Sequence, residues 1–424
     1  MEMVERRQMI LNDPIANHMV NRVGSHIFSF LPPQPFSYSF NIVDDDVFNA
    51  FASPAANIFV YRGLITSLDS IDELAGIIAH EVAHAASRHV SESIDRSKYI
   101  NIGSLAGMLA GVIIGTTSGG DAGAAIIKGS MAVGQTTMLA FTRSNETEAD
   151  EKGIMFLKES CFSPMGLQSG LMKIRAADFR GVEAIPDYVK THPGTGKRIA
   201  HVATILSGYT PSKAKTKCKE NFRFNMVKYR LLGLYSEIEP TFNLLKTQLE
   251  NDPLNPAINY GMGLLCARKF MRKKALSHLK KALSMNVFDP MILLAIGRIY
   301  LLDGEPIKAV NVLQGVKSDP VMGIMAKFHL GEAYLEMQNL ELAKKNLKIV
   351  IDEKPLLYPK AYYNMAHIMS QEKRGGFSHF YLGQYYSKIK KYKNAKFHFN
   401  KALDTLDDSE FIKKTETLLK EISK

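Results

Sequence analysis

The stretch HEVAH, residues 80–84, determines what the first half of this chain can be. It lies in an alanine-rich segment, residues 71–90, whose pattern predicts one buried helix. Positions i and i+4 share a helix face, so the rings of His80 and His84 can reach a common ion. Imidazole nitrogen suits zinc, and the intervening Glu81 can accept a proton from a water molecule that the ion polarises. The motif therefore predicts a catalytic zinc site; the alternative is a helix with two core histidines and no metal.

A third ligand has to come from elsewhere in the chain. Ser87 and Val90 stand where a metzincin would have Gly and His, which excludes that class. A carboxylate from a later helix is the other common solution, and residues 144–150, SNETEAD, supply candidates. Glu146 and Asp150 share one helix face, so one can bind the metal while the other accepts a hydrogen bond from a ligand imidazole.

The other segments of the first half predict mainly helices and a small sheet. Helices are expected over residues 13–30, 71–90, 138–158, 164–176 and 197–206, and short strands over 36–43, 47–51 and 57–61. The glycine-rich residues 102–140 are interpreted as a mobile lid or membrane-facing lip, with plain core helices as the alternative.

The second half repeats itself. Small residues recur at an interval of 34 positions, and so do alanines; they are Gly263, Gly297, Gly331 and Ala275, Ala309, Ala343. That period is typical of tetratricopeptide repeats. Gly383 and Ala395 keep the internal offset of 12 but come 52 residues after Gly331 and Ala343, which predicts an insertion of about half a repeat near residues 355–376.

The positive charge lies entirely in the second half. The chain carries +11; residues 221–424 hold 32 Lys and Arg against 20 Asp and Glu, which leaves 21 against 22 for residues 1–220. A basic half suits a solvated surface, an acidic partner or an anionic membrane surface. No nucleic-acid motif accompanies it, so we expect no nucleic-acid partner. Three cysteines are too few for a disulfide framework, although they allow one disulfide bridge.

Two longer segments make a family recognisable. HEVAH together with residues 142–153, TRSNETEADEKG, resembles the HtpX and CAAX-prenyl-protease superfamily of gluzincin endopeptidases. Residues 48–64 resemble the substrate-edge segment of that family, and residues 191–199 resemble its late His-Pro loop. With the repeats behind it, the chain resembles the BepA-type envelope proteases, from residue 13 to the C-terminus.

The resemblance implies a role for each site residue. Glu146 would be the third ligand of one Zn²⁺ per chain, and Asp150 would lie behind the ligands. His192 would approach the zinc as a fourth ligand that holds the site shut, or as a polar stabiliser when it is open. Arg198 would place positive charge near the developing oxyanion. His89 and His201 have no motif partner and are expected to be structural, and Glu148 falls on a different helix face from Glu146.

The resemblance also implies a substrate and a location. Asn57, Ile58, Phe59 and Val60 would form an edge strand that an extended peptide joins. The substrates would be unfolded or misassembled envelope proteins, in the periplasm or cell envelope, with possible peripheral membrane contact; no signal-peptide pattern is visible in residues 1–7. The repeats would recruit a substrate or protein partner. A latent protease that acts mainly as a chaperone or adaptor is the alternative, and a purely structural zinc protein is a weaker one.

The expected architecture is therefore mainly α-helical. A zincin-like α+β metalloprotease domain with a small β-sheet is expected over residues 1–220. An α-solenoid of tetratricopeptide repeats is expected over residues 221–424.

Overall fold

The computed structural model describes residues 10–53, 56–89, 143–179, 188, 192–210 and 223–422. Two compact units divide the chain, Met1–Ser236 and Glu237–Lys424. The glycine-rich segment 102–140 lies outside the described residues. Its role as a lid or membrane-facing lip therefore stays a prediction. No helix among the described residues combines the length and the apolar character that a bilayer crossing demands.

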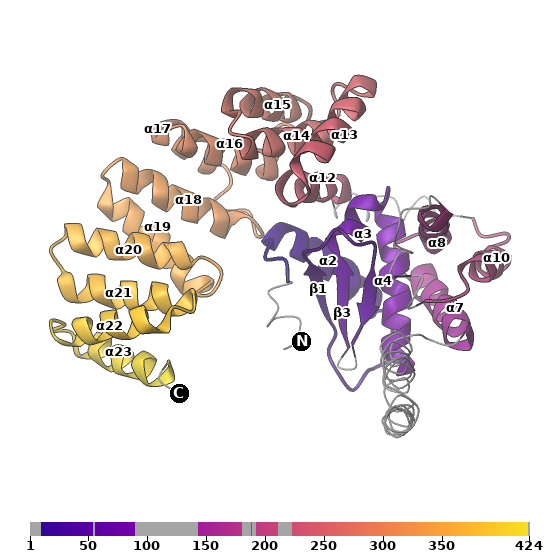
Figure 1. Cartoon of the computed structure of the whole chain (residues 1–424), viewed down its shortest axis with the longest axis horizontal. Helices are drawn as coiled ribbons and strands as arrows, with labels where there is room; N and C mark the ends of the chain where they lie inside the picture. The colour runs from indigo at the N-terminus through magenta and orange to yellow at the C-terminus, as the bar shows by residue number, and fades with distance from the viewer. Residues whose placement is uncertain are drawn as a thin grey trace, which may run out of the picture. The chain divides into compact units, whose positions relative to one another are not determined.

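The first unit combines helices with one small sheet, as expected (Figure 1). Its elements are α2 (Pro14–Phe28), β1 (Ser39–Val43), β2 (Ala50–Ala52), β3 (Asn57–Tyr61), α3 (Arg62–Ser67), α4 (Ile71–Ala86), α7 (Arg143–Glu159), α8 (Met165–Phe179), α10 (Thr195–Ile205) and α12 (Phe224–Tyr235).

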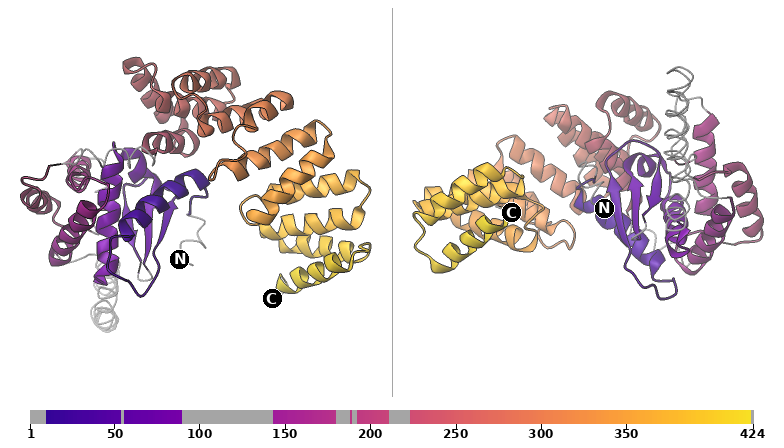
Figure 2. Two further views of the ribbon diagram at one scale, coloured as in Figure 1. Left: turned by 180° about the vertical axis from the view of Figure 1, so that it is seen from behind. Right: turned by 60° about the horizontal axis from the view of Figure 1, so that its bottom comes forward.

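Helix α4 is the centre of this unit. It contacts α2 and the sheet on one side and α7 and α8 on the other (Figures 1 and 2). Small residues let the neighbours approach closely: a Cβ at Gly76 would lie 2.5 Å from the backbone nitrogen of Leu167 in α8. Nearly every residue of α4 is buried, which is why the segment carries so few polar residues besides its motif.

The sheet has the strand order β1-β3-β2. β1 pairs with β3 in parallel along all five residues, and β2 pairs with β3 antiparallel. The outer side of β1 is partly covered, because Leu11 N–H donates to the carbonyl of Ile42 at 2.8 Å and Ile10 forms a bridge with Val43. Among the described residues, β2 is therefore the less covered edge.

A buried polar cluster attaches α12 to the first unit. Asp13 caps α2 by accepting hydrogen bonds from the backbone N–H groups of Ile15 and Ala16. Its carboxylate also accepts from Arg230 Nε at 2.9 Å and from the Tyr235 hydroxyl at 2.8 Å. Because α12 packs on α2 and α3, the first unit extends to Ser236, beyond the boundary expected at residue 220.

The second unit consists of helices only, among its described residues. They are α13 (Ile238–Asn251), α14 (Pro256–Arg268), α15 (Arg272–Met285), α16 (Pro290–Leu302), α17 (Pro306–Leu313), α18 (Gly323–Glu336), α19 (Leu340–Glu353), α20 (Pro359–Gln371), α21 (Gly375–Lys388), α22 (Tyr392–Leu403) and α23 (Ser409–Glu421). Successive helices pack against each other, which confirms the predicted helical array.

The periodic glycines mark where two helices of a pair touch. A Cβ at Gly263, Gly297 or Gly331 would lie within 2.7 Å of a leucine side chain in the next helix; the leucines are Leu279, Leu313 and Leu347. Gly383 meets Phe399 in the same way. Helix α20 lies within the insertion predicted near residues 355–376. This extra helix explains why Gly383 and Ala395 come 52 residues, and not 34, after Gly331 and Ala343.

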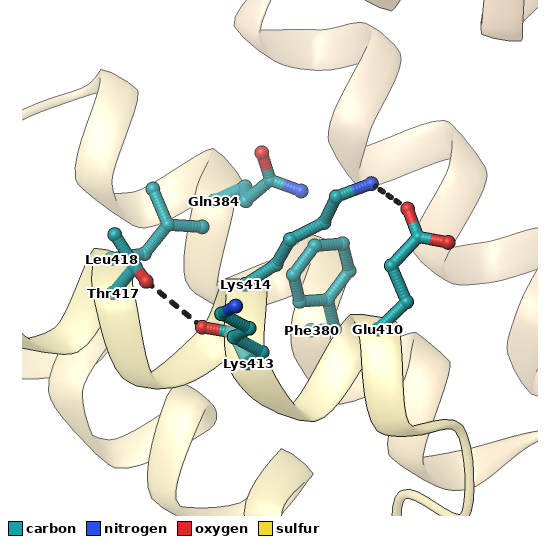
Figure 3. A pocket seen from close by; sticks show the side chains of 7 residues that line it. All are labelled: Phe380, Gln384, Glu410, Lys413, Lys414, Thr417 and Leu418. Carbon is teal, nitrogen blue, oxygen red and sulfur yellow. Dashed lines mark hydrogen bonds and ion pairs between the residues drawn. The ribbon is translucent and has the colours of Figure 1, made fainter.

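The last helix borders a hollow beside α21 (Figure 3). Phe380 of α21 lines it, together with Lys414 and Glu410, which form an ion pair at 2.6 Å along α23. Cys266 is a buried free thiol, whereas Cys161 of the first unit is disulfide-bonded. The chain therefore has one disulfide bridge, which the count of three cysteines had allowed.

Candidate metal centre

Helix α4 carries three of the predicted site residues. Its start is fixed by Ser70, whose hydroxyl accepts from Glu73 N–H at 3.2 Å, while the Glu73 carboxylate accepts from Asp69 N–H at 2.7 Å. His80, Glu81 and His84 follow in the buried middle and end of the helix, and none of the three is exposed to solvent. Isolated burial of such groups is costly, so their polar atoms need partners inside the protein.

Helix α7 brings the carboxylates to α4. Gly153 allows this approach, since a Cβ there would lie 3.3 Å from the backbone nitrogen of His80. One turn or two before this contact, Asp150 and Glu146 face α4 and are fully buried. His192 reaches the same place from the chain just before α10, and it is also fully buried.

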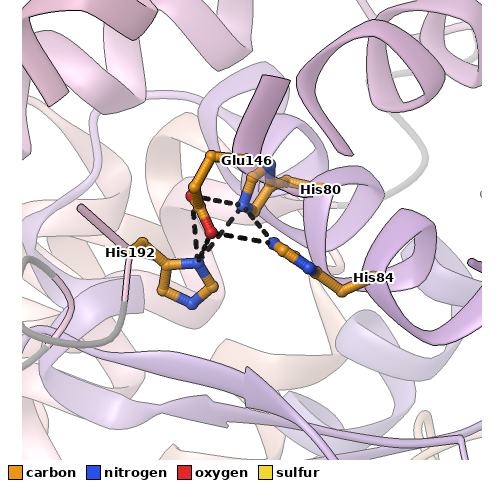
Figure 4. Close-up of side chains that lie close together, drawn as sticks. All are labelled: His80, His84, Glu146 and His192. Carbon is orange, nitrogen blue, oxygen red and sulfur yellow. Dashed lines mark hydrogen bonds and ion pairs between the residues drawn. The ribbon is translucent and has the colours of Figure 1, made fainter. Parts of the chain in front are cut away.

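Four side chains from these segments converge on one point (Figure 4). Each of His80, His84, Glu146 and His192 offers one ligand atom, and these atoms lie within 4.8 Å of one another. His80 Nε2 and His84 Nε2 are 3.0 Å apart, and they lie 3.5 Å and 3.3 Å from the Glu146 carboxylate oxygens. His192 Nδ1 lies 3.1 Å from Glu146 Oε1 and 3.4 Å from His80 Nε2.

The separations fit a small tetrahedral ion. Zinc bonds of about 2.1 Å in tetrahedral geometry place the ligand atoms roughly 3.4 Å apart. The five separations given above run from 3.0 to 3.5 Å. Three imidazole nitrogens and a carboxylate oxygen are also a donor set that zinc accepts. The cluster can therefore hold such an ion with little rearrangement.

Glu81 is placed beside the cluster without hydrogen-bond partners. Both of its carboxylate oxygens are buried, and neither accepts a hydrogen bond from a described residue. His192 Nε2 approaches Oε1 to 3.5 Å. A buried carboxylate with unused acceptors beside a metal cluster is arranged to contact a water molecule or a substrate group.

Asp150 and Arg198 form a second layer behind the ligands. Asp150 Oδ1 lies 2.9 Å from His80 Nδ1, the ring nitrogen that faces away from Glu146. Arg198 donates from Nε and Nη2 to Asp150 at 2.8 and 2.7 Å, and its Nη1 lies 2.6 Å from Glu146 Oε2. The guanidinium is therefore occupied by two carboxylates.

The charges in the cluster keep the carboxylates ionised. Burial acts to raise the pKa of Glu146, but the charge of His192 and hydrogen bonds from the three histidines outweigh it and hold the pKa well below the ordinary value. At Asp150, burial likewise acts to raise the pKa of the carboxyl group. The hydrogen bonds from Arg198 outweigh this effect and lower the pKa to about 2. Both groups thus carry the negative charge that a divalent cation requires.

The predicted edge strand is wrong. Residues Asn57–Val60 belong to β3, which is the central strand because β1 and β2 occupy both of its sides. An added peptide strand therefore cannot pair with it. The pairing of Phe51 with Phe59 leaves the N–H and C=O groups of Ala50 and Ala52 directed away from β3. β2, which contacts α4, is an outer strand of the sheet among the described residues.

Three residues near the site were not anticipated in their role. His89 is buried and lies 3.0 Å from His84, between the two Nδ1 atoms, and Glu148 contacts the far side of His89. Tyr188 stacks on His192 with ring centroids 4.3 Å apart. No spacing rule links these residues to the motif. His201, also expected to be structural, pairs with Glu151 at 2.9 Å on the surface.

Comparisons with known proteins agree with this arrangement. The family model described as Peptidase family M48 matches residues 14–206, and the model described as Tetratricopeptide repeat matches residues 378–405.

Several curated proteins are similar over longer stretches. The Beta-barrel assembly-enhancing protease of Yersinia pestis is 26% identical over 295 residues, which are 69% of this chain and 58% of that protein. The protein of that name from Escherichia coli (strain K12) is 25% identical over 72% of this chain and 69% of its own length. Mitochondrial metalloendopeptidase OMA1 of Schizosaccharomyces pombe is 26% identical over 47% of this chain and 56% of that protein. The chain thus spans less than two thirds of the first relative.

Proposed function

We propose that this chain, in which residues 14–206 form a domain of peptidase family M48 with tetratricopeptide repeats behind it, is a zinc-dependent endopeptidase. The convergence of His80, His84 and Glu146 at spacings of 3.0 to 3.5 Å carries the proposal. When bound, the ion would supply Lewis-acid chemistry, polarising the scissile carbonyl and lowering the pKa of a water molecule.

Glu81 would be the general base. Its buried carboxylate has no hydrogen-bond donor among the described residues, so it is free to take a proton from the attacking water. The same carboxyl group would then deliver that proton to the amine that leaves. Burial next to the cluster keeps bulk water from competing for these acceptors.

His192 would gate the site. A catalytic zinc site has three protein ligands and an open position, whereas four side chains converge in this structure. His192 also lies between the cluster and Glu81, where the reacting water would have to sit. Movement of the segment before α10 would withdraw the imidazole, which could then stabilise the reacting groups as a polar neighbour.

Arg198 and Asp150 would keep the ligands in position. Asp150 accepts from His80 Nδ1, which leaves His80 Nε2 available for the metal. For Arg198 to stabilise an oxyanion directly, it would exchange its contact with Glu146 for the substrate. Its positive charge lies within the site in either arrangement.

An extended substrate would add to β2. Ala50 and Ala52 are buried in this structure, so their outward backbone groups would first have to be uncovered. They would then supply the hydrogen bonds of a short ladder, which need no particular side chain on the substrate. This mode favours unfolded or misassembled proteins. We propose envelope proteins as the substrates and the periplasm or envelope as the location, which suits relatives that are named for enhancing β-barrel assembly. The repeats would recruit the substrate or a protein partner, and the basic second half suits peripheral contact with an anionic membrane.

Metal content and casein cleavage together test the proposal. We expect one zinc per chain in the wild type, Glu81→Gln and His192→Ala, and no cleavage by Glu81→Gln. Glu146→Gln should lose most of the zinc. A Glu146→Gln protein with full zinc would refute the ligand set. Zinc with no cleavage by any variant would instead favour a latent protease that acts as a chaperone or adaptor through its repeats.

A further inference from the structure

His84 is supported from behind by a chain of polar side chains that the reaction itself does not use. Its Nε2 faces the cluster, at 3.3 Å from Glu146 Oε1. Its other nitrogen, Nδ1, lies 3.0 Å from Nδ1 of His89. His89 Nε2 in turn lies 3.2 Å from Glu148 Oε2.

The direction of each hydrogen bond follows from the proton count. A ligand imidazole binds metal through an unprotonated nitrogen, so His84 must carry its proton on Nδ1 and donate it to His89. His89 can accept there only when its own proton is on Nε2, which then points at Glu148. The carboxylate is the acceptor that ends the series.

Glu148 is itself held in place. Its Oε1 accepts from the Ser87 hydroxyl at 3.0 Å and from Lys152 Nζ at 2.7 Å. Lys152 also donates to Ser87 Oγ at 2.8 Å, which closes the group of three. The carboxylate therefore has little freedom to leave His89, although it is partly open to solvent.

On the premise of the proposed function, we infer that His89 is a positioning residue for the metal ligand His84, and that Glu148 fixes His89. The two ligand histidines of α4 are then oriented in different ways. Asp150 contacts the Nδ1 atom of His80 directly at 2.9 Å, whereas the carboxylate behind His84 acts through an intervening imidazole. Groups behind a metal ligand typically change metal affinity 10- to 100-fold when removed, roughly.

Zinc affinity of the full chain tests this inference. The dissociation constant is measured by competition with a chromophoric chelator for the wild type, His89→Phe and His89→Gln. We expect His89→Phe to weaken binding about 10- to 100-fold, because the acceptor that His89 offers to His84 Nδ1 is then lost. His89→Gln offers an amide oxygen and should recover most of the loss. The absorption spectrum of the cobalt-substituted protein should shift in His89→Phe and return towards wild type in His89→Gln.

A matched control separates positioning from general damage. His201→Phe removes a surface histidine that also pairs with a glutamate of α7, Glu151 at 2.9 Å. It should leave the zinc affinity unchanged. Equal weakening by His89→Phe and His201→Phe would overturn the inference.

A second variant covers the case in which His89→Phe does not fold. Glu148→Ala changes a side chain that is 45% exposed, and it should weaken zinc binding several-fold while the metal-free protein keeps its melting temperature. Affinity within twofold of wild type in the folded His89 and Glu148 variants would overturn the inference while the proposed function stands. A wild type that binds no zinc would overturn both.

Discussion

His192 Nδ1 lies 3.1 Å from Oε1 of Glu146, although the two residues are 46 positions apart and belong to different segments. His192 also stacks on Tyr188 and approaches Glu81, so it fills the space in front of the catalytic helix. The contact therefore predicts a site that rests in a closed state.

Removal of the imidazole should open that site. We expect His192→Ala to retain zinc and to cleave casein about 10-fold faster or more, because the competent state is otherwise a small fraction of the molecules. Initial rates at equal zinc content measure this, with His201→Ala as the control on a surface histidine. A rate equal to or below that of the wild type would contradict gating.

Loss of Asp13 should destabilise the first unit strongly. Asp13→Ala removes the cap of α2 and leaves the buried Arg230 guanidinium without its carboxylate. Breaking a buried pair costs about 3–5 kcal/mol, which denaturant unfolding of the full chain can detect. Asp13→Asn keeps a capping oxygen and should be intermediate. A loss below about 1 kcal/mol in Asp13→Ala would refute the role assigned to this cluster.

The repeat glycines should not tolerate a methyl group. Gly297→Ala places a Cβ 2.5 Å from Leu313 Cγ, so the leucine side chain or one of the two helices must shift. Overpacking of this kind costs about 1–3 kcal/mol, measured as the shift of the unfolding free energy. Gly375→Ala is the matched control, since nothing lies within 4 Å of a Cβ there. Equal effects of the two substitutions would show that close approach is not the reason for the glycine.

Glu332 should make the second unit sensitive to acid. Burial raises the pKa of this carboxyl, but the hydrogen bond and charge of His329 and the contact with Lys360 prevail and lower it from 4.5. A lowered carboxyl pKa stabilises the fold above the unfolded value and loses this effect as pH falls through the folded value.

The matching measurement compares Glu332→Gln with the wild type at pH 6 and pH 3. The variant should be less stable by about 1 kcal/mol at pH 6, and the difference should shrink towards zero at pH 3. A difference that is constant with pH would show that the pair contributes through packing alone.

The local parts of this architecture could be predicted from sequence. Helix α4 follows from its apolar composition and from the Ser70 and Glu73 start signal, both of which act within a few residues. The repeats follow from glycine at a fixed period, because the same close contact between two helices recurs in each repeat. The group of His80, His84, Glu146 and His192 was inferred from motif order and resemblance, and the structure brings all four together.

Features that depend on contacts between residues far apart in the chain could not be predicted from local sequence patterns. β3 is a short run with three consecutive buried apolar residues, and its pairing with β1 and β2 makes it the central strand. His89 lacks a motif because its partner Glu148 lies 59 residues away. The extent of the first unit also depends on a distant contact, since α12 is held there by Asp13 from the opposite end of the unit.

Gly153 has a consequence for how this protein can change over time. The distance from Glu146 to the two imidazoles depends on two backbones that meet at Gly153, where a methyl group would lie 3.3 Å from the His80 nitrogen. Adjustments in the core between α4 and α7 are therefore also adjustments of the catalytic geometry. Substitutions there cannot drift neutrally with respect to activity, so a lineage that altered this contact would have to re-tune its chemistry at the same time.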